Sequence, residues 1–175
     1  MIEGFINATV NAHDEQALFG ILHGAYWGLS VSDLVRIASA RSYSTSLTAI
    51  LESETKLREL GVEHVGEAQN VLATIRSARE REVSEAPHRV LEYILKQSGF
   101  LEHVIAHDPL EGGRVVRRLY DEVEKMVLYD NKTTLREVSE VLKRYRAHRI
   151  ALNAPYIAGN DIEGDYDMVS RVGLK

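Results

Sequence analysis

The chain has 175 residues, of which 45% are hydrophobic and 27% are charged, so it is long enough to bury a core of its own. It contains no cysteine, which excludes disulfides, thiolate-bound metal sites and a cysteine nucleophile, and which is typical of a reducing compartment. The net charge of -5 removes overall basicity as an argument for nucleic-acid binding, although a local basic patch stays open.

The first half of the chain predicts a series of short helices. Apolar residues at helical spacing predict a helix over 13–24, and Ser30 and Asp33, at the spacing of a capping box, predict the start of another helix after a turn. These two helices would form a helix-turn-helix near the N-terminus. Residues 47–60 predict one or two further helices, whereas residues 1–10 fit either a helix end or a short strand.

The second half of the chain predicts longer helices. Composition predicts a helix over 69–82, and an apolar stripe behind a proline predicts the next over 87–99. A brief helix over 101–106 follows, and then a longer one over 108–127. The last predicted helix covers 134–145 and begins with a second capping box.

No stretch alternates apolar and polar residues for long enough to predict a strand. We therefore predict an all-α fold, an irregular multi-helix domain of about seven or eight helices over residues 1–152. Residues 153–175 lack helical signals and are expected to form a loop or a poorly ordered tail. No apolar run approaches the roughly 18–20 residues of a membrane span, and the start lacks the basic stretch of a signal peptide. We therefore expect a cytoplasmic protein with no membrane partner.

The search for catalytic and metal-binding motifs predicts no catalytic, cofactor-binding or metal-binding residue. The Walker A motif, G-x-G-x-x-G after a strand, H-E-x-x-H and G-x-S-x-G are all absent. His103 and His107 have the i, i+4 spacing of a zinc-binding pair, but they lack a clear third ligand, and two surface histidines are the simpler interpretation. Acidic residues alternate from Asp161 to Asp167, yet a calcium loop also requires a central glycine and a distal glutamate between two helices. We therefore predict that these acids belong to a solvated tail.

Two predicted helices each carry a cluster of basic residues. The clusters are Arg114, Arg117 and Arg118 on one helix, and Lys143, Arg144, Arg146 and Arg149 at the end of the other. Two interpretations stay open for them. Cations favour a solvated helix face and a helix C-terminus. A stripe of cations also binds phosphates, with salt-dependent affinity and without sequence preference.

Three segments of the chain resemble, in the same order, motifs of the UvrD/Rep-type superfamily 1 DNA helicases. Residues 11–30 (NAHDEQALFGILHGAYWGLS), with Asp33 and Leu34 after them, are similar to a helix that begins N-P-x-D-E-x-A-L and leads into a G-[IL]-[GS] turn. Residues 90–101 (VLEYILKQSGFL) are similar to L-L-x-x-I-L-x-x-[ST]-G-[YF]-L, and residues 113–120 (GRVVRRLY) to R-x-x-N-L-x-x-L. The exonuclease V branch, with its RecB and AddA-like enzymes, is the most similar, and the likeness covers residues 7–150.

In that family these segments belong to the 2B subdomain, an all-helical insertion in the second RecA-like motor domain. The resemblance therefore implies that the Walker motifs, ATP and Mg belong to motor domains outside these 175 residues. The segment itself would be an accessory module with no activity alone. It would contact duplex or forked DNA, the motor domains and, as a further candidate, a partner subunit. The parent enzyme would be an ATP-dependent helicase, a hydrolase of DNA repair and recombination.

The resemblance also predicts where DNA would bind. Gly28, Leu29 and Ser30 match the family's Gly-Ile-Gly turn, although Ser30 replaces its second glycine and the bulky Trp27 precedes it. A hydroxyl at this position could still donate to a phosphate, and a capped helix start favours an anion. We add Lys143, Arg144 and Arg149 from the second basic cluster to the predicted DNA-binding residues. The alternative is a helical protein-interaction module without DNA binding, and an exposed apolar patch beside Tyr26 and Trp27 would favour it.

Overall fold

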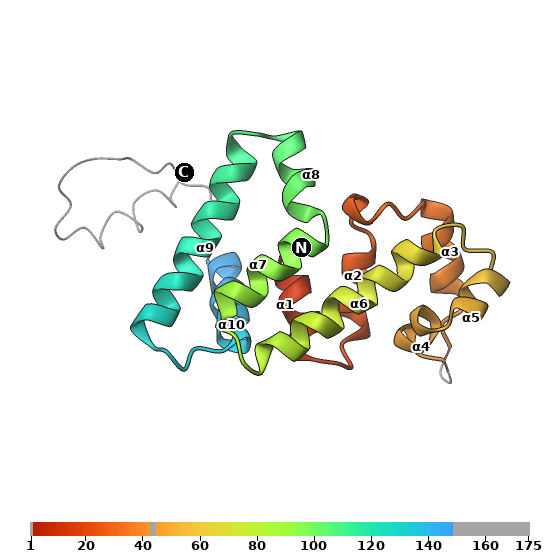
Figure 1. Ribbon diagram of the computed structural model, residues 1–175, viewed down its shortest axis with the longest axis horizontal. Coiled ribbons are helices and arrows are strands. Elements are labelled where there is room, and N and C mark those ends of the chain that lie inside the picture. The colour runs from red at the N-terminus through yellow and green to blue at the C-terminus, as the bar shows by residue number, and fades with distance from the viewer. Residues whose placement is uncertain (1, 43–44, 149–175) are drawn as a thin grey trace.

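The computed structural model describes residues 2–42 and 45–148 of the chain. All regular structure in these residues is helical (Figure 1), which confirms the predicted all-α fold. In chain order the elements are α1 (Ile2–Val10), α2 (Glu15–Leu22), the 3-10 helix η1 (Ala25–Trp27), α3 (Val31–Ser39), α4 (Leu47–Glu52), α5 (Glu54–Glu59), α6 (Val65–Glu82), α7 (Pro87–Gln97), α8 (Phe100–His107), α9 (Glu111–Tyr129) and α10 (Leu135–Ala147). None of these helices is long and apolar enough to span a membrane. The predicted tail over 153–175 lies outside the described residues.

The described residues form more α-helices than the predicted count of about seven or eight, and two segments account for the difference. The N-terminal residues, which fitted either a helix or a strand, form α1 because Phe5, Ile6 and Thr9 fall on one buried helical face. The segment 47–60 is divided into α4 and α5 at Ser53. The Ser53 side chain accepts the N–H of Lys56 and thereby starts a new helix.

Helix α6 connects the two halves of the molecule. It runs diagonally through Figure 1, with α3, α4 and α5 near one end and α7 near the other. It packs against α1, α4, α5 and α7. One face of α6 is therefore apolar along its length, and its buried residues are Val65, Ala68, Val71, Leu72, Thr74, Ile75 and Ala78.

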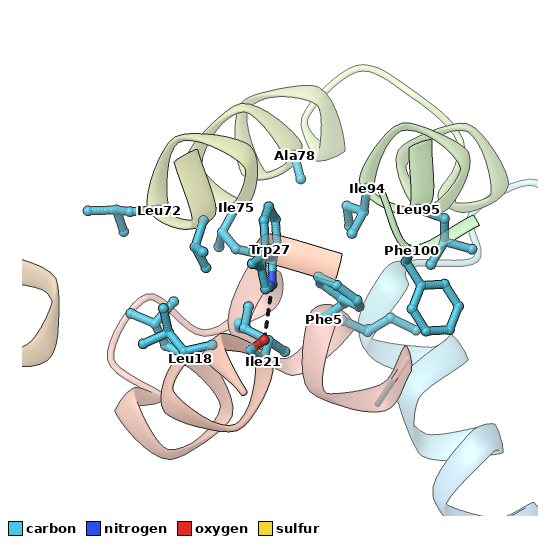
Figure 2. Packing of buried hydrophobic residues seen from close by; sticks show 14 of the residues in the cluster. Phe5, Leu18, Ile21, Trp27, Leu72, Ile75, Ala78, Ile94, Leu95 and Phe100 are labelled. Atoms are coloured by element: carbon cyan, nitrogen blue, oxygen red, sulfur yellow. Dashed lines mark hydrogen bonds between the residues drawn. The ribbon is translucent and has the colours of Figure 1, made fainter. Parts of the chain in front are cut away.

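An aromatic cluster fills the space between α1, η1 and α8. The Phe5 ring lies 6.2 Å from the rings of both Trp27 and Phe100, and the Tyr26 ring meets the Phe100 ring edge-on at 5.4 Å. Trp27 is only 4% exposed, and its indole N–H donates to the carbonyl of Ile21 at 3.0 Å (Figure 2). Because the indole nitrogen keeps a partner, the whole ring can leave water without an unsatisfied polar group.

The C-terminal helices join this core through two contacts. Helix α9 packs on α7 and α8 with Val116, Leu119 and Val123 buried. Helix α10 packs on α1, where the Ser139 hydroxyl donates to the Asn7 side-chain oxygen at 2.7 Å. The first and last described helices therefore lie against each other.

Two adjacent glycines in α9 provide a test of its packing on α8. A Cβ on Gly112 would lie 2.5 Å from Val104 Cγ1 and 2.8 Å from the Val104 carbonyl oxygen, whereas a Cβ on Gly113 would meet nothing within 4 Å. We expect Gly112→Ala to lower the free energy of unfolding by about 1–3 kcal/mol because of this overlap. We expect Gly113→Ala to raise it by about 0.5–1 kcal/mol because alanine favours a helix. Urea denaturation measures both, and equal effects would contradict the close approach of the two helices.

Candidate functional site

The predicted contact turn, Gly28 to Ser30, connects η1 to α3. Gly28 has φ 75° and ψ 10°, in the left-handed region that favours glycine. Its N–H donates to the Ala25 carbonyl at 3.2 Å, and the residue is exposed. Leu29, by contrast, is half-buried and packs against the core. Of these two residues Gly28 is the one whose backbone faces solvent.

Ser30 forms the predicted capping box with Asp33. The Ser30 hydroxyl accepts the Asp33 N–H at 3.0 Å and donates its hydrogen to Asp33 Oδ2 at 2.8 Å, while the Ser30 N–H points to the same oxygen at 3.3 Å. The hydroxyl hydrogen that we expected to be available to a phosphate is therefore bonded to Asp33. By their position in a helix, the N–H groups of Val31 and Ser32 are the ones left without intrahelical acceptors.

The Asp33 carboxylate is fully buried and holds two further partners from a distant loop. The Glu63 N–H donates to Asp33 Oδ1 at 2.8 Å, and His64 Nδ1 lies 2.6 Å from Asp33 Oδ2. Both residues belong to the loop between α5 and α6. The carboxylate therefore holds this loop against the start of α3, and Arg36 of α3 lies 3.8 Å from Asp33 Oδ1. We call this cluster the α3 clasp, and its members are Ser30, Asp33, Arg36, Glu63 and His64.

The clasp changes the protonation of its two central groups. Burial alone would raise the pKa of Asp33, but hydrogen bonds from the Glu63 N–H, from His64 and from Ser30 outweigh burial and hold this pKa well below its ordinary value. The hydrogen bond to Asp33 raises the pKa of His64, with a smaller contribution from the nearby charges of Glu63 and Glu67. Sequence analysis predicted the Ser30–Asp33 contact but missed His64, because no local pattern joins residues 31 positions apart.

Acidic groups surround the contact turn. Arg36 bonds to the Gly61 carbonyl and lies 3.3 Å from the Glu63 carboxylate. A Cβ on Gly28 would lie 3.9 Å from Cγ of Glu67. Three carboxylates, those of Asp33, Glu63 and Glu67, thus lie near the turn, against one guanidinium and one imidazole. Electrostatics at this turn do not favour a polyanion.

The two basic clusters lie on α9 and α10, which approach each other near Tyr145. The Tyr145 hydroxyl of α10 lies 3.5 Å from the Glu122 carboxylate of α9, and Arg118 lies near enough to act on the pKa of Tyr145. The middle of α9 therefore approaches the second half of α10. We call the exposed or half-exposed cations gathered there the basic end, and its described members are Arg114, Arg117, Arg118, Lys143 and Arg144. The predicted contact Arg149 lies outside the described residues.

The contact turn and the basic end do not form one surface. In Figure 1, whose longest axis is horizontal, α3 lies toward one end of the molecule and α9 toward the other. The loop that connects η1 to α3 is on the α3 side.

The sequence contains two other candidate patterns, a histidine pair that could bind a metal ion and an apolar patch beside Trp27 that could dock a protein. The rings of His103 and His107 are tilted by 37° with centroids 4.0 Å apart, and His107 Nδ1 lies 2.9 Å from the His103 carbonyl oxygen. In the part of the chain that the structure describes, no group of three or more His, Cys, Asp or Glu side chains could hold a metal ion. Trp27 is buried, so the apolar patch that would favour a docking role beside it is not formed by that ring.

Comparison of the chain with protein-family models, with curated proteins and with solved structures found no match.

We expect Asp33→Asn to lower the free energy of unfolding by about 2–4 kcal/mol, because the amide loses the charge and cannot accept all the N–H groups that face the carboxylate. Glu137→Gln is the matched control. Glu137 accepts the Thr134 N–H at 2.7 Å in the second capping box, but it is exposed, so its change should cost no more than about 1 kcal/mol. Urea denaturation measures both losses of unfolding free energy. Equal losses in the two variants would contradict the conclusion that burial makes the Asp33 carboxylate more important than an exposed capping carboxylate.

The clasp also predicts a pH dependence of stability. Because the pKa of His64 is raised, its stabilisation is complete below the ordinary histidine value of about 6.5 and declines as the pH rises through the raised value. Because the pKa of Asp33 is lowered, its stabilisation is complete above the ordinary value of about 3.9 and is lost as the pH falls below it. The free-energy difference between the wild type and His64→Gln should thus be largest between about pH 4 and 6.5. A difference that stays constant from pH 4 to pH 9 in urea titrations would contradict this.

Proposed function

We propose that this chain is an accessory helical module of an ATP-dependent DNA helicase, similar to the 2B subdomain of the UvrD/Rep family, and that it contacts duplex or forked DNA through the basic end. The observation that carries the proposal is the approach of the end of α10 to the middle of α9, which brings cations from two separate sequence clusters to one region. A group of surface cations that contacts phosphates gives affinity without sequence preference. Such contacts suit a module that holds duplex while other domains do the chemistry.

The cations of the basic end are available for exchange with phosphates. Lys143 Nζ lies 2.8 Å from the Glu140 carboxylate, and these side chains are 45% and 56% exposed. Exposed pairs of this kind contribute only about 0–1 kcal/mol. Arg144 donates to the Glu140 carbonyl at 3.3 Å, a neutral acceptor on its own helix. A phosphate therefore replaces these partners at small cost.

The contact turn has a smaller role in this proposal. Its donors are the backbone N–H groups of Val31 and Ser32, with the His64 imidazole and Arg36 close by. The carboxylates of Glu63 and Glu67 oppose an approaching phosphate there. The turn then acts mainly as a rigid connection between α2 and α3, and the basic end supplies the electrostatic attraction.

In this proposal the module holds DNA in position while other domains do the chemistry. ATP and Mg are held by motor domains of the parent helicase, which are its first partners, and a partner subunit is a further candidate. No residue of this chain has a catalytic role in the proposal. DNA repair and recombination in the cytoplasm are the setting that the resemblance implies.

Fluorescence anisotropy with labelled duplex and forked DNA tests the proposal. We expect weak binding at low salt and a linear fall of the logarithm of affinity with the logarithm of salt concentration. Lys143→Gln with Arg144→Gln should lower the magnitude of this slope by about 1.8, which corresponds to two phosphate contacts. The control pair is Arg58→Gln with Arg89→Gln, two exposed arginines on α5 and α7 with local carboxylate partners.

An equal loss of slope in the control pair would show that binding follows net charge and not the basic end. Absence of binding at low salt would reject DNA contact by this chain. The alternative function, a protein-interaction module without DNA binding, would then be favoured. The observation on its side is that Val31 and Val35 lie one helical turn apart on α3, 78% and 58% exposed.

A further inference from the structure

A cleft of about 450 Å³ lies between the α1–α2 connection, the start of α4 and the middle of α6. Its volume falls within the roughly 300–1,000 Å³ typical of small-molecule sites. Apolar side chains of α1, α2 and α6 form the floor, and polar residues form the rim. The lining consists of Ala8, Asn11, Ala12, His13, Asp14, Glu15, Leu18, Ser46, Thr48, Leu72, Ile75, Arg76 and Arg79.

The carboxylates of the rim already have partners. Asp14 accepts the Ala17 N–H at 2.8 Å and caps α2. Glu15 accepts the Leu47 N–H at 2.8 Å through one oxygen and pairs with Arg41 at 3.1 Å through the other. These bonds hold the two acids in the walls of the cleft, and the charge of Glu15 is paired with Arg41.

The donors of the rim are only partly used. Arg79 donates through Nε to the Thr9 carbonyl at 3.0 Å and through Nη2 to the Ala8 carbonyl at 2.9 Å, which leaves Nη1. These two bonds fix the guanidinium against the end of α1. Arg76, one turn away on α6, pairs with Glu52 through Nη2 alone.

Three neutral side chains add further donors. Within residues 2–42 and 45–148, no hydrogen-bond partner meets the Asn11 amide nitrogen, the His13 ring or the Thr48 hydroxyl. Together with the two arginines they surround an apolar floor. More donors than acceptors on this rim are without a partner, and such a cleft favours a ligand that brings acceptors.

We propose that this cleft binds a small ligand or side chain that carries an oxyanion, a carboxylate or a phosphate, on an apolar body such as an aromatic ring. The oxyanion lies between Arg76 and Arg79, where planar guanidinium groups match its geometry. The apolar body covers Leu18 and Leu72 on the floor. The site is independent of the proposed DNA contact, because no lining residue belongs to α9, α10 or the contact turn.

Amide chemical shifts of the ¹⁵N-labelled full chain test the proposal with four probes: phenyl phosphate, benzoate, inorganic phosphate and benzyl alcohol. We expect saturable shifts at residues 11–15 and 46–48 with phenyl phosphate or benzoate, with a dissociation constant on the order of 1 mM. The tighter of these two probes identifies the oxyanion. Inorganic phosphate should bind more weakly because it lacks the apolar body, and benzyl alcohol because it lacks the charge.

Arg76→Gln should weaken binding of the better probe about tenfold, since one charge-assisted hydrogen bond is lost. Arg89→Gln on α7 is the matched control and should leave the affinity unchanged. If the Arg76 variant does not give a native spectrum, Thr48→Val replaces it, with an expected loss of about threefold to tenfold. Unchanged affinity in the folded cleft variant, equal binding of benzyl alcohol, or no localised shifts would each overturn the proposal.

Discussion

The removal of one carboxylate from water governs how the N-terminal half of this molecule is arranged. A buried charge is tolerated only where hydrogen bonds replace its hydration, and Asp33 obtains them from its own helix start and from Glu63 and His64. The loop between α5 and α6 must therefore lie against α3. This fixes the direction in which α6 leaves the loop, and α6 in turn carries the packing of α1, α4 and α7.

The two candidate contact regions, the contact turn and the basic end, differ in the charges that surround them. Around the turn, three carboxylates face one guanidinium and one imidazole, and the hydroxyl of Ser30 is bonded to Asp33. On α10, by contrast, Lys143 pairs with a carboxylate that is itself exposed. A chain with net charge -5 can thus repel DNA over much of its surface and still attract it at one end. In the proposed DNA contact, such a distribution orients the chain relative to a duplex.

Local patterns in the sequence predicted local structure well. Both capping boxes form, because the partners of Ser30 and Thr134 lie three residues away in the same turn of chain. Contacts between distant residues left no such pattern. The bond from Arg79 to the end of α1 spans 70 residues. The burial of Trp27 depends on Phe5 of α1 and on the contact of η1 with α6. The cleft between α1, α4 and α6 was missed for the same reason, because its lining comes from three separate stretches of the chain.

The contact between Asn7 and Ser139 has a consequence for how this helical body connects to other domains. Its partners are 132 residues apart, and loop closure over that length costs on the order of 4 kcal/mol in chain entropy. The packing of α1 on α10 offsets this entropy cost. The first and last described helices are therefore neighbours, so the chain enters and leaves the helical body on adjacent helices. A folded unit with adjacent entry and exit can be spliced into a surface loop of a host domain without disturbing the host's own topology.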